Sequence, residues 1–404
     1  QKEAPLPRIA FISVHGCPLA ELGTKNAGGM NVYIGQLAQH LGRLGFNVDI
    51  FTRIHQADTP VVEEYSENVR IIHIDAGPAN VAKEEIFDYL PDFVAKAKEY
   101  QAREAALYDA LHTHYWLSGW VGQRLSQDWH IPHITTFHTL SEIKSRAHIG
   151  TDEATSRSVT EGQVAEGADR IIVSTSHERD ALKQLYAVSQ ENVRVVSGGV
   201  DLSLFQPGNQ QAAKTKLGVG GSQTLLYVGR LDPIKGVEVL IHTVSQITTS
   251  RNIEVLIVGG HSSDPEYQRL SEIARELAIL DRIDFVGAQN HDLLPTYYQA
   301  ADICVVPSYY ESFGLVALEA MACGLPVITT PVYGIKNIIK HRINGYLCGD
   351  TTATSIRETI ISVMNNQELN KAISINARNT ITNNYSLESV LREEIGIYKE
   401  LELI

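Results

Sequence analysis

Two glutamates on either side of an expected helix start are the first residues whose spacing suggests chemistry. Glu311 and Glu319 frame a segment in which a strand ends at Pro307 and a helix begins near Phe313. Carboxylates accept hydrogen bonds from sugar hydroxyls, while a helix start that Gly314 leaves open can hold a phosphate on backbone N–H groups. The alternative is a capped helix, with Glu311 interacting with the helix dipole and Glu319 forming a surface ion pair.

A pair of cations follows another strand-like run, Leu225–Gly229. Arg230 comes directly after it, and Lys235-Gly236 opens the next helix. Two cations at a strand end suit a diphosphate, and Arg is well matched to bidentate phosphate contacts. The alternative is a solvated surface pair, but in a chain of net charge −13 this placement favours phosphate binding.

A loop from Gly16 to Gly29 follows the first strand and ends in Gly28-Gly29 at a helix start. Adjacent glycines let the backbone approach a ligand, and the helix start offers N–H groups to an anion. A plain tight turn is an equal alternative. The G-x-G-x-x-G fingerprint is absent here, and the similar cluster 218–221 precedes a strand, which argues against a nicotinamide dehydrogenase.

Histidine and cysteine spacing gives no support for a metal site. His112, His114 and His133 stand on strand-like runs without a neighbouring Cys or acidic cluster, so structural histidines are favoured. The cysteines lack CxxC or metal-ligand spacing and fit a reducing cytosol. They are Cys17, Cys304, Cys323 and Cys348.

The elements that must position these residues alternate between short apolar runs and amphipathic segments, which predicts parallel sheets covered by helices. The pattern restarts at Thr224–Gly229, after a Gly- and Pro-containing segment, Ser197–Lys216, with the composition of a linker. We expect an α/β protein with a Rossmann-like domain over 1–207 and a second over 208–385. The last helix, 386–404, could pack back on the first domain. Two doubly wound domains would bind a ligand in the cleft between the carboxyl ends of their strands.

Length and charge set outer limits on function. The 404 residues match two domains, and 34 Lys+Arg against 47 Asp+Glu argue against a nucleic-acid partner. No apolar run reaches the roughly 18 residues of a membrane span. The polar start runs directly into a strand, so no signal peptide is expected and a cytoplasmic location is predicted, with peripheral membrane association left open.

The chain resembles the retaining glycosyltransferases of family 4, which have the two-domain GT-B fold. The resemblance rests on Arg230…Lys235 followed by Glu311-Ser-Phe-Gly…Glu319, and it covers nearly the whole chain. Further matching segments are Gly28–Tyr33, His112–Gly119, His138–Leu140 and Gly199–Phe205. The subgroup most similar to it contains the mycothiol-type inositol-phosphate glycosyltransferases and the bacterial sucrose-phosphate synthases.

The resemblance implies roles on the donor side. It gives the transfer step to His138, Arg230, Lys235 and Glu311. It gives donor binding to Gly28, Gly29, Ser312, Phe313, Gly314, Leu315, Val316 and Glu319. In this view Arg230 and Lys235 neutralise the diphosphate and Glu319 holds the ribose hydroxyls. His138 faces the sugar near its anomeric carbon.

An acceptor pocket is implied by a second set of matches: Lys83, Tyr115, Thr139, Lys144 and Arg157. Three cations around one cleft would suit a phosphomonoester. Each alone has an ordinary explanation: a solvated helix start for Lys83, the core for Tyr115 and a helix-surface ion pair for Arg157. Leu117-Ser118 and Met30 depart from sucrose-synthesis patterns toward the mycothiol type, whereas the stretch 172–179 looks like sucrose-phosphate synthases.

We therefore expect transfer of a hexosyl unit, most simply glucose from UDP-glucose, to a hydroxyl acceptor such as a sugar or inositol phosphate. No Asp-x-Asp triplet occurs, so a metal-independent, front-face retaining mechanism without a cofactor is expected. The alternatives are exopolysaccharide or glycolipid synthesis, a phosphorylase or epimerase, and a non-catalytic nucleotide-sugar-binding protein. Oligomerisation is left open.

Overall fold

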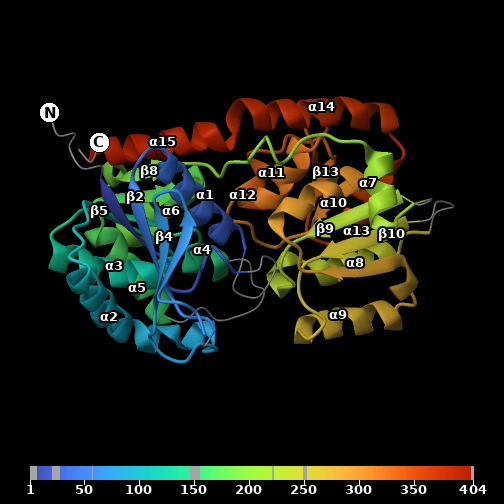
Figure 1. Cartoon of the computed structure of the whole chain (residues 1–404). Helices are drawn as coiled ribbons and strands as arrows, with labels where there is room; N and C mark the ends of the chain where they lie inside the picture. Colours follow the sequence, from blue (N-terminus) through green and yellow to red (C-terminus); the bar gives the residue numbers. More distant parts are fainter. Residues whose placement is uncertain are drawn as a thin grey trace.

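The computed structural model describes residues 7–20, 28–56, 58–145, 155–220, 223–248 and 253–401. It contains two α/β lobes side by side, and the last two helices run along one side of both lobes (Figure 1). The expected fold class, two doubly wound Rossmann-like domains, is confirmed. None of the helices in these ranges is both long and apolar enough to cross a lipid bilayer.

The first lobe contains an eight-stranded sheet with the order β3-β4-β2-β1-β5-β6-β7-β8. Its strands are β1 (Arg8–Ile12), β2 (Asn47–Arg53), β3 (Val62–Ser66), β4 (Val69–Ile74), β5 (Ala110–His114), β6 (His133–Thr136), β7 (Arg170–Val173) and β8 (Val193–Val195). Its helices are α1 (Gly29–Arg43), η1 (Lys83–Tyr89), α2 (Leu90–Arg103), α3 (Trp116–Trp129), α4 (Ser141–Ser145), α5 (Thr155–Gly167), α6 (Ser176–Tyr186) and η2 (Gln190–Asn192).

The second lobe contains a six-stranded parallel sheet with the order β11-β10-β9-β12-β13-β14. Its strands are β9 (Gln223–Val228), β10 (Ile253–Val258), β11 (Ile283–Gly287), β12 (Ile303–Val306), β13 (Val327–Thr329) and β14 (Tyr346–Leu347). Its helices are α7 (Gln210–Leu217), η3 (Pro233–Lys235), α8 (Val237–Ser245), α9 (Pro265–Glu276), η4 (Leu280–Arg282), η5 (His291–Leu293), α10 (Leu294–Ala300), α11 (Leu315–Ala322), α12 (Tyr333–Lys336) and α13 (Ala353–Met364).

The apolar runs that the sequence marks as strands are buried on both faces, as parallel strands between helices require. β1 and β12 are examples, because almost every residue in each is buried. The sequence did not indicate β3, which pairs antiparallel to β4 at the sheet edge. Its Glu63 and Glu64 interrupt the apolar pattern because an edge strand is partly solvated.

The chain returns to the first lobe through α14 (Gln367–Asn384) and α15 (Leu387–Glu400). Between these helices, Ser386 forms a parallel bridge with Val200, and the Val200 carbonyl accepts from the Leu387 N–H at 2.8 Å. The Ser386 hydroxyl then caps α15 by accepting from the Ser389 N–H. The two lobes are therefore joined twice, by the linker and by the α14–α15 junction.

α15 packs on the first sheet through an apolar face that includes Val390, Leu391 and Tyr398. A buried polar network accompanies this face. The Tyr398 hydroxyl and Nδ1 of His112 lie 2.7 Å apart, and the Tyr33 hydroxyl donates to Glu394 at 2.5 Å. These bonds fix α15 against β5 and α1.

We predict that replacing the buried Glu394 by Gln removes a pH-dependent destabilisation. Burial raises the pKa of Glu394 from 4.5 to about 8. As pH rises, the unfolded chain therefore loses this proton at a lower pH than the folded chain does. The free energy of unfolding then falls as pH rises through that interval. Urea titrations at a pH below this interval and at a pH above it give the free energy of unfolding of both proteins. The difference between Glu394→Gln and the wild type should shift in favour of the variant at the higher pH, by on the order of 1–3 kcal/mol.

Burial and the charge of Glu394 raise the pKa of Tyr33 and Tyr398, but both hydroxyls stay protonated throughout this interval, so Glu394 itself accounts for the difference. The pKa of the neighbouring His112 is lowered mainly by burial. Glu388→Gln, at an exposed position of the same helix, is the matched control and should track the wild type. A pH-independent difference between Glu394→Gln and the wild type would contradict the prediction.

Candidate active site

The two cations after β9 lie beside the loop after β12, because β9 and β12 are neighbours in the second sheet. Nζ of Lys235 contacts Oε1 of Glu311 at 2.7 Å, and the Ser308 hydroxyl donates to the same oxygen. Arg230 lies 3.5 Å from Asp232, and both side chains are about one-third exposed. The structure thus brings together the predicted Lys235 and Glu311, with the carboxylate fixing the ammonium group.

The start of α11 is shaped to meet an anion. Gly314 precedes the helix with φ 80° and ψ 46°, a left-handed conformation that glycine adopts without strain. A Cβ at this position would lie 2.3 Å from Ile335, so space also requires glycine. The first N–H groups of the helix have no partner within it. Ser312, Leu315 and Val316 are partly exposed at this start.

Phe313 contributes differently from its neighbours. Its ring is 8% exposed and packs beside Gly198, where a Cβ would lie 2.5 Å from the ring. The ring of Tyr385 lies beside the ring of Phe313, with their centroids 6.1 Å apart. The side chain of Phe313 is therefore part of the core between the linker and the C-terminal helices, and the predicted donor contact could involve only its backbone.

Glu319 lies inside α11 with both oxygens hydrogen-bonded. Oε1 lies 2.8 Å from Nε2 of His291, and Oε2 accepts from the Tyr298 hydroxyl at 2.8 Å. Burial alone would lower the pKa of His291, but the hydrogen bond and charge of Glu319 raise it. Each carboxylate oxygen keeps a second lone pair for a further donor. The alternative of a surface ion pair for Glu319 is wrong, because the residue is buried.

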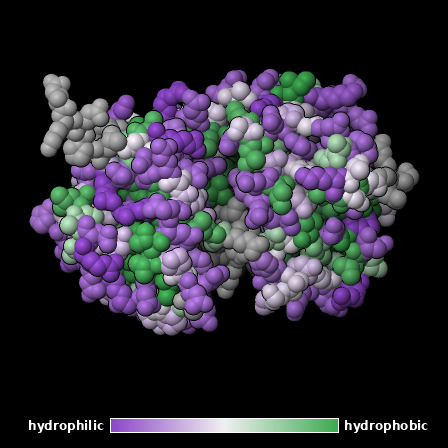
Figure 2. All heavy atoms as spheres, in the orientation of Figure 1, coloured by the Kyte–Doolittle hydropathy of each residue, from purple (hydrophilic) through white to green (hydrophobic). Residues whose placement is uncertain are grey.

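The two glycines at the start of α1 face the second lobe. A Cβ at Gly28 would lie 3.8 Å from the Arg230 side chain, and one at Gly29 would lie 3.7 Å from Leu315. The start of α1 therefore faces the two elements predicted to hold the donor phosphates. Figure 2 shows a notch in the surface between the two lobes.

Other contacts join the lobes around this cleft. Tyr310, just before Glu311, packs against an apolar cluster of the first lobe that includes Phe137 and Leu140. The rings of His177 and Tyr333 stack with centroids 3.9 Å apart. The two lobes therefore touch through both of these contacts.

His138 lies in the loop after β6 with φ 61°, and its Nε2 is 3.1 Å from Nδ1 of His114. Burial lowers the pKa of His138 to about 3. The ring is neutral at physiological pH and suits hydrogen bonding better than proton donation. Tyr33 packs edge-on against it, with centroids 5.4 Å apart.

The residues of the expected acceptor pocket gather around Tyr115 in the first lobe. Nζ of Lys83 lies 4.3 Å from the Tyr115 ring centroid, and the Arg157 guanidinium lies 4.9 Å from it. Arg157 also donates to the Thr139 hydroxyl at 2.9 Å and pairs with Glu161 at 2.7 Å. The predicted acceptor residues Lys83, Tyr115, Thr139 and Arg157 thus converge. Lys144 belongs to α4, but its side chain lies outside the described part of the structure.

Electrostatic effects link this pocket to the donor side. Burial lowers the pKa of Lys83, and the charges of Arg230 and Arg157 lower it further. His15 lies against Tyr115, with ring centroids 4.6 Å apart. Burial lowers the pKa of His15, as do Lys83, His138, Arg157 and Arg230. Four cationic side chains therefore lie around the cleft: Lys83, Arg157, Arg230 and Lys235. Three of them pair with a carboxylate: Arg157 with Glu161, Arg230 with Asp232 and Lys235 with Glu311.

Sequence reasoning missed His15, His291 and Tyr298. His15 had a usable signal, since it follows β1 by three residues at the carboxyl edge of the sheet. His291 and Tyr298 carried none, because they belong to η5 and α10 and meet Glu319 only in the folded chain. The interpretation of His112 and His133 as structural agrees with their hydrogen bonds to Thr136 and Thr113.

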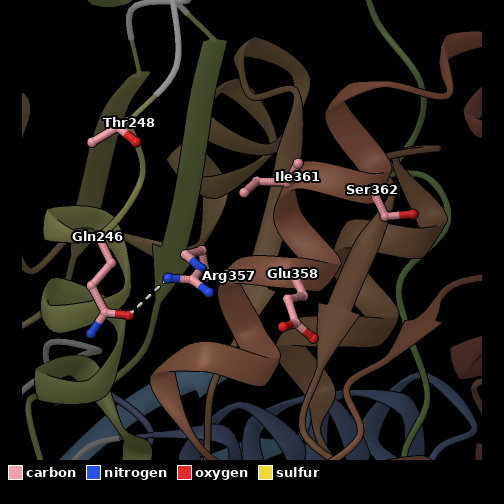
Figure 3. Close-up of a pocket in the computed structure, with 6 residues that line it drawn as sticks. All are labelled: Gln246, Thr248, Arg357, Glu358, Ile361 and Ser362. Atoms are coloured by element: carbon pink, nitrogen blue, oxygen red, sulfur yellow. Dashed lines mark hydrogen bonds between the residues drawn. The ribbon is translucent and has the colours of Figure 1, made fainter.

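A separate surface cavity of about 420 Å³ lies between the end of α8 and α13. Figure 3 shows its lining, in which Arg357 approaches Gln246 at 3.5 Å. Thr248, Glu358, Ile361 and Ser362 complete it. None of the predicted site residues lines this cavity, so it is distinct from the cleft.

Family models match both lobes. Residues 27–204 match the model described as "Glycosyltransferase Family 4", and residues 209–380 match "Glycosyl transferases group 1". The division between the two matches falls at the linker.

Similar proteins span nearly the whole chain. A D-inositol 3-phosphate glycosyltransferase of Saccharomonospora viridis is 38% identical over 92% of this chain and 89% of its own. A D-inositol 3-phosphate glycosyltransferase 2 of Catenulispora acidiphila is 40% identical over 84% of this chain and 82% of its own.

Among solved structures, the sucrose-phosphate synthase of Thermosynechococcus elongatus superposes with a TM-score of 0.91. It is 35% identical, and the match covers 98% of this chain and 99% of that chain. Anabaena HepE in complex with UDP-glucose has a TM-score of 0.80 at 19% identity, covering 97% and 99%, which shows a shared fold only. On its cleft geometry, its two family matches and these full-length relatives, the chain belongs to the family 4 glycosyltransferases of the GT-B fold.

Proposed function

We propose that the protein is a retaining glycosyltransferase that moves a glucosyl unit from UDP-glucose to a hydroxyl of a phosphorylated sugar or inositol. The observation that carries this proposal is the set of cationic side chains that both lobes place around one cleft. Arg230, Lys235 and the α11 start lie on the donor side, and Lys83 and Arg157 surround Tyr115 on the acceptor side.

The donor arrangement suits departure of a nucleotide diphosphate. Negative charge grows on the leaving phosphate as the bond from C1 of the sugar to that phosphate breaks. Fixed cations and backbone N–H groups stabilise such charge most when they are already in place. Lys235 is held in place by Glu311, and Gly314 leaves the start of α11 accessible.

These groups support transfer without a divalent metal, because they supply the charge that a metal would otherwise bring. In the front-face mechanism, the acceptor oxygen bonds to C1 on the face that the phosphate leaves. The departing phosphate oxygen takes the acceptor proton, so charge and atoms balance without a protein nucleophile. The neutral His138 forms a hydrogen bond with the donor sugar.

The acceptor phosphate is supported by the named relatives and by the pocket. The inositol 3-phosphate glycosyltransferases and the sucrose-phosphate synthase share 35–40% identity with this chain. Their names point to phosphorylated cyclitol or hexose chemistry, and a phosphomonoester matches the charges around Tyr115. A phosphorylated inositol and a phosphorylated hexose are therefore compared as acceptors in the same experiment.

The defining experiment incubates the protein with UDP-glucose and each of inositol 3-phosphate, fructose 6-phosphate, inositol and fructose, with and without Mg²⁺ or Mn²⁺. We expect UDP release and a new glycoside only with a phosphorylated acceptor, at a rate independent of the added metal. NMR of the product should show the anomeric configuration of the donor. An inverted product, a trapped glycosyl-enzyme or a strict metal requirement would reject the mechanism.

Lys235→Met tests the donor side. Removing this cation should lower turnover by roughly 100-fold, because leaving-group charge loses its partner. The double variant Lys235→Met/Glu311→Gln removes the carboxylate left unpaired, and it should be at least as slow because Glu311 is itself assigned to the transfer step. Lys371→Met, at an exposed position of α14, controls for loss of one charge. Steady-state UDP release provides the comparison, and turnover near wild type would remove Lys235 from the donor site.

Lys83→Met tests the acceptor side without breaking the buried Arg157–Glu161 pair, whose disruption is strongly destabilising. We expect KM for the phosphorylated acceptor to rise about 10-fold, the loss typical of one charged hydrogen bond. KM for UDP-glucose should be unchanged. Lys96→Met, on α2, is the control. Equal effects on phosphorylated and unphosphorylated acceptors would show that Lys83 does not contact the phosphate.

A further inference from the structure

Three potential metal ligands converge at one edge of the first sheet. Ligand atoms of Cys17, His55 and His73 all lie within 4.8 Å of one another. Cys17 is in the loop after β1, His55 follows β2 by two residues, and His73 lies in β4. Because the sheet order is β4-β2-β1, these three positions are neighbours in space although distant in sequence.

His73 is held in the orientation that a metal ligand needs. Its Nδ1 lies 2.8 Å from the Pro60 carbonyl, which can only accept, so Nδ1 carries the proton. The lone pair is then on Nε2, which faces Sγ of Cys17 at 4.0 Å. A backbone carbonyl that fixes the far nitrogen of a ligating histidine is the usual supporting contact in metal sites.

A carboxylate of the neighbouring strand adds negative charge to this group. Glu63 lies on the edge strand β3, which pairs with β4, and its charge acts on both Cys17 and His73. A bound cation would offset this negative charge.

We propose that Cys17, His55 and His73 bind one Zn²⁺ ion. One sulfur and two imidazole nitrogens form a donor set that zinc prefers, and the fourth position remains for water or Glu63. With bonds of about 2.0–2.3 Å the ligand atoms of a tetrahedral site lie roughly 3.5 Å apart, so small shifts suffice. On binding, the thiol releases its proton to solvent and a sulfur lone pair forms the Zn–S bond.

The site would fix the loop that leads to the cleft. The Cys17 carbonyl accepts from Nδ2 of Asn31 at 2.7 Å, and Oδ1 of Asn31 accepts from the Gly28 N–H at 3.4 Å. His15, two residues before Cys17, lies against Tyr115. Zinc therefore stabilises the position of Cys17 relative to α1 and the pocket, and takes no part in the transfer step.

The test uses the full chain, stripped of metal, re-equilibrated with Zn²⁺ and dialysed. Elemental analysis should find one zinc per chain. With Co²⁺ in place of Zn²⁺, a thiolate-to-metal absorption band should appear in the near ultraviolet, with the intense visible bands of a tetrahedral ion. Cys17→Ser should abolish the thiolate band and weaken Zn²⁺ binding beyond the roughly 10–100-fold loss typical of supporting residues.

Cys348→Ser, which replaces a buried cysteine of the second lobe, is the matched control and should bind as the wild type. His55→Ala replaces an exposed side chain, so it tests the site even if Cys17→Ser fails to fold, and it should also weaken binding. The proposal is overturned if the wild type retains no zinc. It is equally overturned if zinc binds without a thiolate band and with the same affinity in Cys17→Ser and His55→Ala.

Discussion

Parallel strand pairing is the constraint from which the cleft follows. Parallel strands place all their carboxyl ends at one edge, and the loops that follow them must meet there. In the second sheet, Arg230 and Glu311 follow the neighbouring strands β9 and β12. In the first sheet, Tyr115 and His138 follow the neighbouring strands β5 and β6. Because both edges face the gap between the lobes, residues from four loops converge without any single loop being long.

Much of this arrangement was predictable from local sequence. A strand end, a glycine and a helix start within a few residues identify Gly28, Gly314 and Arg230, since the chemistry of each position depends on its immediate neighbours. The alternation of apolar and amphipathic segments gave the fold class, whereas the acceptor set around Tyr115 came from the resemblance to family 4. Which acceptor the pocket binds stays a prediction, because the charges that converge there match any phosphomonoester of suitable size.

Local sequence could not reveal contacts between residues of unrelated segments. Glu319 was identified as a carboxylate near a ligand, but its partners His291 and Tyr298 come from helices whose patterns show only amphipathicity. The spacing of the cysteines likewise argued against a metal site, because spacing motifs detect only ligands that lie close together in the sequence. Cys17, His55 and His73 meet only through the strand order β4-β2-β1. The order of the strands depends on the whole sheet, so no single segment of the sequence reveals it.

The docking of α15 on the first sheet has a consequence for how the protein is made. Synthesis proceeds from the N-terminus, and domains generally fold as units in that order. Here the apolar face of the first lobe that receives Val390, Leu391 and Tyr398 can be covered only after the second lobe has been translated. The first lobe therefore leaves this face exposed while the second lobe is being made, until α15 is available to pack on it.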